Sequence, residues 1–203
     1  MRLGTEVTSF FLTIIIGVTS FTGDSLLYNL KNSTLRAISD NVTHALVGGL
    51  SWTLVITLSK NSVTRNLLGI TLCFVISSLI DLDHFLLAKS WKLQDASHLG
   101  NQRPVLHCST IPLVVLVIFE ISSRILHCSS GGYYILVFIT GVFSHHIRDA
   151  TRRGMWFCPF GSTPPIPYYL YICIAMGLPY LIYWLMPDGI IKDNYQLLSI
   201  HAV

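Results

Sequence analysis

The chain has 203 residues, of which 52% are hydrophobic and 11% are charged, and its mean hydropathy is +0.60. Soluble domains carry about 25% charged residues, so this composition excludes an ordinary soluble protein and indicates an integral membrane protein. A net charge of +3, with dispersed basic residues, argues against nucleic-acid binding. The five cysteines form no Cys-x-x-Cys pair, which argues against a thiolate zinc cluster.

Apolar runs divide the chain into six candidate membrane spans. A helix needs about 20 mostly apolar residues to cross a bilayer. The first run resembles a signal peptide, but Glu6 lies where such a peptide is basic, so we expect a retained helix. The sequence therefore predicts an all-α integral membrane protein, a single multi-pass domain over residues 1–203 built as a bundle of about six transmembrane helices. The runs lie at 8–28, 43–59, 66–88, 108–126, 132–149 and 166–186.

Polar residues collect on one membrane face of this six-span arrangement. In "SSLIDLDHFLLAK", residues 77–89, two aspartates and a histidine interrupt an apolar run. Because alternate loops lie on alternate membrane faces, helix ends from five spans place their polar residues on the same face. An isolated acid costs about 2.5–3.5 kcal/mol at the bilayer centre, and a shared metal would offset that cost. The residues are Asp24, Asp40, His44, Asp81, Asp83, His84, His107, His145, His146 and Asp149.

Helical spacing selects candidate ligands from this set. His145 and Asp149 are four residues apart and share a helix face, and Asp40 and His44 have the same spacing. Imidazole and carboxylate donors suit a divalent transition metal, zinc or manganese. Six candidates exceed four tetrahedral positions, so either two metals bind or some of the six only orient the others. The expected metal ligands are His44, Asp81, His84, His107, His145 and Asp149.

The two aspartates of the third span cannot both face one metal from a regular helix. Asp83 lies about 200° around the helix from Asp81, whereas Asp81 and His84 share a face. Unless the helix unwinds there, one aspartate orients a histidine ligand from outside.

Basic residues on the same face suggest an anionic group. Arg148 and Arg152 are one turn apart and repel each other by a few tenths of a kcal/mol, which a bound phosphate or lipid headgroup would relieve. We expect Arg148 and Arg152 to bind substrate. Arg103 or Arg148 would hold the anionic group during catalysis, with Asp83 or Asp40 as base or orienting group.

Four segments resemble a known family. "LRAISDNVTHALVGGLSW", "SSLIDLDHFLLAKS", "RPVLHCST" and "SHHIRDATRRGMWFCPFG" closely resemble the transmembrane protein 267 family of animals, multi-pass proteins of undetermined function. A more distant similarity is to bacterial membrane-bound metal-dependent hydrolases of the YdjM-like group. That resemblance places Thr43-His44, Asp81-x-Asp83-His84, Arg103 with His107, and His145 with Asp149 on the motifs of the group. The chain departs from these motifs at Ile80, Gln102, Leu106 and Cys108.

Two functions of different classes remain open from the sequence. One is a membrane-embedded metal-dependent hydrolase acting on a lipid or amphiphilic ester, in which the metal activates water for attack on an acyl or phosphoryl centre. The other is a non-enzymatic scaffold, lipid-binding or transport protein with a relic polar cluster. Membrane lipids are the expected partners, and the sequence does not define an oligomeric state.

Basic residues favour a cytosolic site face by the positive-inside rule. The sequons at Asn32 and Asn41 would then carry no sugar. The site face has Lys31, Arg36, Lys89, Lys92, Arg103, Arg148, Arg152 and Arg153, against Arg2, Lys60, Arg65, Arg124 and Lys192 opposite.

Overall fold

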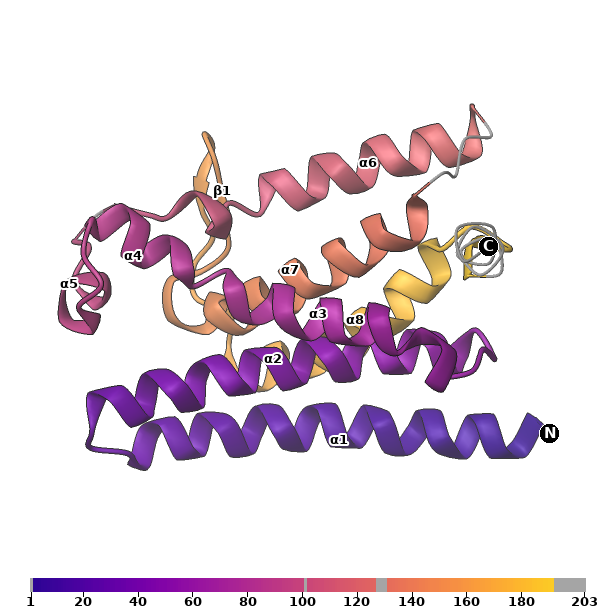
Figure 1. Cartoon of the computed structure of the whole chain (residues 1–203), viewed down its shortest axis with the longest axis horizontal. Coiled ribbons are helices and arrows are strands. Elements are labelled where there is room, and N and C mark those ends of the chain that lie inside the picture. Colours follow the sequence, from indigo (N-terminus) through magenta and orange to yellow (C-terminus); the bar gives the residue numbers. More distant parts are fainter. Residues whose placement is uncertain (1, 101, 127–130, 192–203) are drawn as a thin grey trace, which may run out of the picture.

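The computed structural model describes residues 2–100, 102–126 and 131–191, and most of them are helical. The helices run back and forth along one long axis (Figure 1). The longer helices are α1 (Arg2–Asn29), α2 (Ser33–Leu58), α3 (Leu67–Leu79), α6 (Thr110–Arg124), α7 (Gly132–Arg153) and α8 (Tyr168–Leu185). The shorter elements are η1 (Thr64–Asn66), α4 (Leu82–Ala88), α5 (Leu93–Ser97), η2 (Val105–His107), β1 (Trp156–Phe157) and β2 (Gly161–Ser162).

The predicted all-α membrane bundle is confirmed, with α3 and α4 together forming the third of about six passes. Within the described residues, four helical segments are long and apolar enough to cross a membrane: Gly4–Asn29, Ser33–Leu58, Thr64–Ala88 and Tyr168–Leu185. The fourth pass is shorter than predicted, because α6 has 15 residues and so extends about 22 Å. The fifth is longer, because α7 continues as a helix through Arg153.

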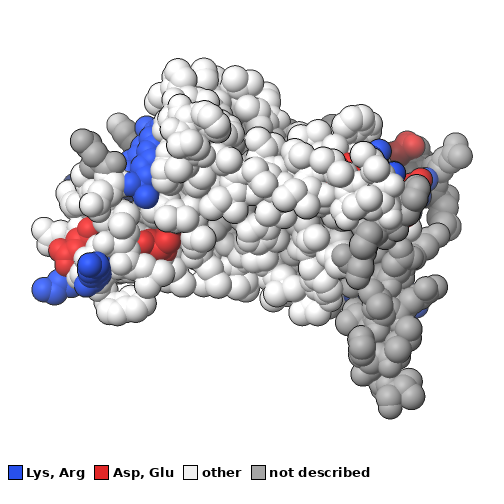
Figure 2. Space-filling model, turned by 90° about the horizontal axis from the view of Figure 1, so that it is seen from above, with Lys and Arg blue, Asp and Glu red and all other residues white. Residues whose placement is uncertain are grey.

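Charged side chains gather at the two ends of the molecule, and an uncharged band separates them on the face drawn in Figure 2. This distribution is typical of a protein whose middle is surrounded by lipid. The site end is our name for the end that carries α4, α5 and the β1–β2 hairpin, opposite the N-terminus (Figure 1).

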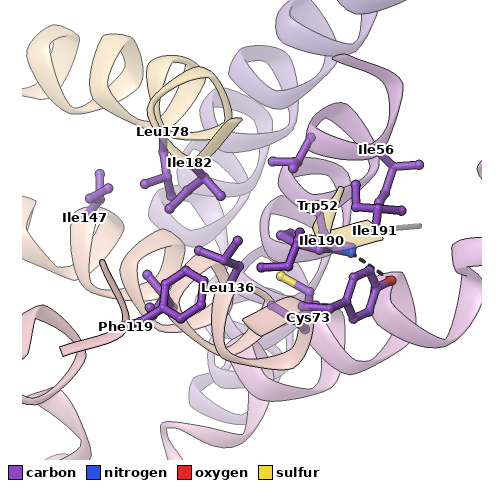
Figure 3. Close-up of a cluster of buried hydrophobic side chains, with 14 of the residues drawn as sticks. Trp52, Ile56, Cys73, Phe119, Leu136, Ile147, Leu178, Ile182, Ile190 and Ile191 are labelled. Carbon is purple, nitrogen blue, oxygen red and sulfur yellow. Dashed lines mark hydrogen bonds between the residues drawn. The ribbon is translucent and has the colours of Figure 1, made fainter. Parts of the chain in front are cut away.

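The core is packed around α7, which contacts α2, α3, α6 and α8. Trp52 of α2, Leu136 of α7 and Ile182 of α8 are almost fully buried in one cluster (Figure 3). The indole of Trp52 donates a hydrogen bond of 3.4 Å to Tyr133 Oη, drawn as the dashed line in Figure 3. A buried polar end of an aromatic side chain needs such a partner. This cluster fixes α7, and with it the polar residues in its last turns.

The third pass breaks where its aspartates begin. α3 ends at Leu79 and α4 starts at Leu82, so the helix is interrupted at the aspartates, an alternative that the sequence left open. Thr64–Ala88 as a whole is still one candidate membrane span, as predicted for 66–88.

At the interruption, the Asp83 amide donates to the Ile80 oxygen at 3.3 Å and the His84 amide donates to the Asp81 oxygen at 3.2 Å. Both aspartates reach His107, from opposite sides of its ring, with Asp81 Oδ1 3.5 Å from Nε2 and Asp83 Oδ1 3.3 Å from Nδ1.

Small residues let α2, α3 and α7 approach closely near Ser77. A Cβ on Gly48 would lie 2.6 Å from Ser77 Cβ, and one on Gly141 would lie 2.9 Å from Ile76 Cγ2. Small residues are what close packing of membrane helices requires. The Ser77 hydroxyl donates to the backbone oxygen of His44 at 2.8 Å. The contact links α2 and α3 next to the polar cluster.

A sharp turn after α7 brings the hairpin against the start of α6. Gly154 has a φ of 70°, and a Cβ there would lie 1.8 Å from the backbone oxygen of Thr163. The hairpin contacts the segment before α6, since the Ser109 amide donates to the oxygen of Trp156 at 2.7 Å. This contact holds η2, which carries His107, over the end of α7.

Candidate metal centre

Four donor atoms from three parts of the chain converge at the site end. Asp81 Oδ1, His107 Nε2, His145 Nε2 and Asp149 Oδ2 come from the α3–α4 break, η2 and α7. The two Nε2 atoms lie 3.2 Å apart. Asp149 Oδ2 lies 3.3 Å from each nitrogen, and Asp81 Oδ1 lies 3.5 Å from each.

These separations match a tetrahedral metal site. Four ligands bound roughly 2.0–2.1 Å from zinc lie about 3.3 Å from one another. The five donor separations above range from 3.2 to 3.5 Å. All four atoms lie within 4.8 Å of one another. The residues present therefore fit a divalent cation without rearrangement of the backbone.

Hydrogen bonds turn both histidines toward the shared centre. His145 Nδ1 donates to the backbone oxygen of Ser77 at 2.8 Å, which leaves Nε2 with its lone pair. His107 Nδ1 faces Asp83, with Oδ1 at 3.3 Å and Oδ2 at 3.4 Å. A carboxylate or carbonyl behind a histidine is the usual support of a metal-binding imidazole. The two facing Nε2 atoms are then both acceptors, so the pair needs a cation or a proton between them.

Asp83 supports His107 from outside, as the sequence argument allowed for one of the two aspartates. Asp83 Oδ2 also accepts a hydrogen bond of 2.7 Å from the Leu106 amide. This backbone contact does not depend on the side chain at position 106, where the chain departs from the bacterial motif. His84 packs edge-on against His107, with ring centroids 4.7 Å apart, and its Nδ1 lies 3.4 Å from Asp83 Oδ1 and 3.7 Å from Asp81 Oδ1. Asp83, His84 and His107 thus form a second, adjoining donor group.

His44 lies behind Asp149 and outside both donor groups. Its Nε2 is 3.4 Å from Asp149 Oδ1, and its ring stacks on that of His145 with centroids 3.8 Å apart. The side chain is 1% exposed, and among the described residues neither ring nitrogen has a hydrogen-bond partner. This position suits a residue that orients Asp149.

His146 is the other histidine of the α7 pair, and both of its ring nitrogens form hydrogen bonds within the protein. Nε2 donates to the backbone oxygen of Leu106 at 2.8 Å, and Nδ1 accepts from the Ser109 hydroxyl at 3.0 Å. His146 therefore anchors η2 to α7.

The cluster favours positive charge at His107, which lies in the loop before α6. Burial lowers the pKa of this imidazole, but the carboxylates of Asp149, Asp81 and Asp83 outweigh burial and raise the pKa to about 11. A bound proton or a bound metal cation would supply the positive charge that these carboxylates favour.

The anion between Arg148 and Arg152 is Asp40, a residue of the protein itself. Arg152 binds Asp40 Oδ1 at 2.7 Å and Oδ2 at 2.8 Å, and Arg148 donates to Asp40 Oδ1 as well. Arg148 is 2% exposed and also donates to Asp24 Oδ1 at 2.8 Å, while Tyr171 donates to Asp24 Oδ2 at 2.5 Å. The geometry gives Arg148 and Asp40 a role in joining α1, α2, α7 and α8, and Asp40 also lines the cavity described next.

A cavity of about 540 Å³ opens beside the four donors. Asp81, His107 and Asp149 form part of its wall, together with Arg103 and Arg152. Arg103 Nη2 donates to the backbone oxygen of Arg153 at 2.9 Å. Arg103 and Arg152 therefore lie where the sequence argument needs them for an anionic group, and Arg148 does not line the cavity.

Sequence reasoning missed the supporting contacts that come from serine and tyrosine. Ser77 fixes the His145 ring through its backbone oxygen, and Tyr171 holds Asp24. No side-chain pattern marks a backbone acceptor. Tyr171 is one of several tyrosines near the start of the last span, which are typical of a membrane interface.

Comparisons with known proteins identify close relatives of one kind. Transmembrane protein 267 of Xenopus laevis is 38% identical over 176 residues, which cover 84% of this chain and 80% of that protein. Transmembrane protein 267 of Mus musculus is 36% identical over 182 residues, covering 88% and 83%. The Bos taurus protein of the same name is 38% identical over 158 residues, covering 77% and 71%.

No protein-family model matches the sequence. No solved structure matches it either.

Proposed function

This chain belongs to the transmembrane protein 267 family, and from that premise we propose that the protein is a membrane-embedded metal-dependent hydrolase whose His/Asp cluster binds a divalent metal. The observation that carries the proposal is that five of the six donor separations among Asp81, His107, His145 and Asp149 lie between 3.2 and 3.5 Å, and all lie within 4.8 Å. Zinc or manganese would fit these donors.

The residues around the four donors have separable tasks. Asp83 fixes the orientation of His107, the Ser77 carbonyl fixes His145, and His44 lies against Asp149. A divalent metal here would supply a nucleophile from water near neutral pH. Arg103 and Arg152 line the adjoining cavity and would hold an anionic part of the substrate or the negative charge that develops during attack.

The order of the motifs supports the same reaction class. His44, Asp81, His107, His145 and Asp149 fall on motif positions of the bacterial YdjM-like hydrolases in chain order, and we include that distant kinship in the proposal. All five lie within one cluster, although 105 residues separate the first from the last. The substrate class would be a lipid or another amphiphilic ester, because the cavity lies at an end of the membrane bundle.

Metal-dependent turnover tests the proposal directly. Purified protein in detergent micelles, loaded with zinc or manganese, should hydrolyse a member of a panel of medium-chain carboxylic and phosphoric p-nitrophenyl esters, and a chelator should stop the reaction. Asp149→Asn and His145→Ala should each reduce the metal-dependent rate by at least about 100-fold, since water alone is a poor nucleophile at neutral pH.

The matched control is His98→Ala, because His98 is exposed and bonds the Gln94 carbonyl within α5. This variant should keep the wild-type rate. Equal rates for wild type and His145→Ala, or metal-loaded protein inactive on the whole panel, would contradict the hydrolase and favour the scaffold, lipid-binding or transport alternative.

We also propose that the site end faces the cytosol. Asn32 caps α2 by accepting from the Leu35 amide at 3.0 Å, and Asn41 accepts from the Ser78 hydroxyl within the bundle. Of the basic residues counted on the opposite side, Lys192 lies outside the described residues.

Glycosylation mapping tests this orientation. Protein expressed in animal cells should show no mobility shift on glycosidase treatment, because a cytosolic Asn32 never meets the oligosaccharyltransferase. An engineered sequon in the loop between α2 and η1 should be glycosylated as the positive control. Sugar on native Asn32 would reverse the orientation.

A further inference from the structure

We propose that the cavity beside the His/Asp cluster binds a membrane lipid with a phosphate headgroup. The phosphate would lie among Arg103, Arg152 and Arg153, and an acyl chain would lie along Ile38, Phe85 and Trp91. This inference rests on the proposed function for the identity of the cavity as a substrate site, and it deepens that function by naming the headgroup chemistry.

One wall of the cavity is apolar although it lies at the charged end of the molecule. Ile38 is 55% exposed and Trp91 is 79% exposed, and both line the cavity. The ring of Phe85 stacks against Trp91 with centroids 6.0 Å apart. A cavity of about 540 Å³ lies within the size range of small-molecule sites, about 300–1,000 Å³. An alkyl chain would cover this apolar surface.

The cavity also carries guanidinium groups without acidic partners. Arg103 and Arg153 form no ion pair with any acid in the described ranges 2–100, 102–126 and 131–191, whereas Arg152 is paired with Asp40. Planar guanidinium donors match phosphate oxygens in pairs. The acids that line the cavity already have partners, since Asp40 pairs with Arg148 and Arg152, and Asp81 and Asp149 face the histidines of the cluster. Arg103 and Arg153 are therefore the charges left to meet an anionic ligand.

The surroundings of the cavity point to a lipid in place of a soluble phosphate. Exposed apolar side chains surround this part of the site end, with Leu86 at 66%, Val105 at 66% and Phe160 at 87%. Exposed Trp and Phe next to Lys and Arg are typical of the headgroup depth of a membrane. A ligand entering between these residues comes from the bilayer, with its headgroup at the depth of the arginines and its chain among the apolar residues.

Binding of two fluorescent lipids that differ only in the headgroup tests the inference. The probes are phosphatidic acid and diacylglycerol with the same labelled acyl chain, titrated into the 203-residue chain in maltoside micelles, once with zinc and once with a chelator. Phosphatidic acid should bind at least about tenfold tighter than diacylglycerol, as expected for charge-assisted hydrogen bonds. The double variant Arg103→Gln with Arg153→Gln should lose that preference and keep the affinity for diacylglycerol.

Controls come from the opposite end of the bundle. Arg65→Gln and Trp184→Ala alter exposed residues outside the cavity and should bind both probes as wild type does. Trp91→Ala should weaken both lipids, because it removes part of the apolar wall. Circular dichroism and monodisperse elution confirm that each variant folds.

The outcomes separate this inference from the proposed function. Equal affinity of wild type for the two lipids, or an unchanged preference in the double variant, would overturn the inference. Competition by inorganic phosphate or glycerol 3-phosphate at the affinity of the lipid would identify a soluble ligand and would also overturn it. Lipid preference in metal-loaded wild type that hydrolyses none of the esters would contradict only the hydrolase.

Discussion

Replacing Arg148 by methionine should destabilise the helix bundle by about 3 kcal/mol, near the lower end of the range for breaking a buried ion pair. The arginine is 2% exposed, while its partners Asp24 and Asp40 retain 21% and 17% exposure and so keep part of their hydration. Without Arg148, Asp24 loses its charged partner and keeps the hydrogen bond from the neutral Tyr171 hydroxyl. Denaturant unfolding in micelles, followed by circular dichroism, measures the change.

The matched control is Arg124→Met. Arg124 pairs with Glu120 one turn away on α6, with the arginine 58% and the glutamate 18% exposed. Because this arginine stays hydrated, its loss should cost less than that of Arg148, nearer the roughly 0–1 kcal/mol of exposed pairs. If Arg148→Met and Arg124→Met reduce the free energy of unfolding equally, the buried network does not hold the four helices together.

The second large effect is stabilisation of the protein by metal. Zinc or manganese at about 100 times its dissociation constant should raise the free energy of unfolding by about 2.7 kcal/mol, since only the folded chain assembles the four donors. His145→Ala removes a donor and should abolish this stabilisation. Thermal unfolding with and without metal measures it.

Two further variants make this metal test specific. Asp83→Asn keeps all four donors but weakens the support of His107, so about 10–100 times more metal should be needed for the same stabilisation. His98→Ala should respond to metal as wild type does, because His98 is outside the cluster. Equal stabilisation of wild type and His145→Ala would show that metal acts elsewhere on the protein.

The fold was largely predictable because its signal is hydrophobicity. Runs of about 20 apolar residues indicate membrane helices. Five of the predicted runs lie close to the range of an observed helix; the run 8–28, for example, lies within α1, Arg2–Asn29. The break at Ile80 and Asp81 was not predictable from periodicity, since the run 66–88 continues through it. At the break, Asp81 and Asp83 both contact His107, a residue more than 20 positions away in sequence, and helical periodicity carries no signal of such a contact.

The sequence was sufficient to predict which residues form the cluster, but not the role of each residue in it. Helical spacing correctly paired His145 with Asp149, whose nitrogen and oxygen lie 3.3 Å apart. The same rule paired Arg148 with Arg152 and suggested an external anion, whereas tertiary packing supplies Asp40 from α2. Which partner neutralises a charge depends on the approach of other helices, and one helix contains no information about that approach.

Elemental analysis of detergent-purified protein tests the central claim most directly. Wild type, His107→Ala, His145→Ala and the control His98→Ala would be compared after incubation with zinc or manganese and removal of free metal, with folding checked by elution and circular dichroism. The account predicts about one metal ion per chain in wild type and His98→Ala, and loss of that ion in the two cluster variants. Folded wild type that carries no metal, or cluster variants that retain it, would contradict the metal centre.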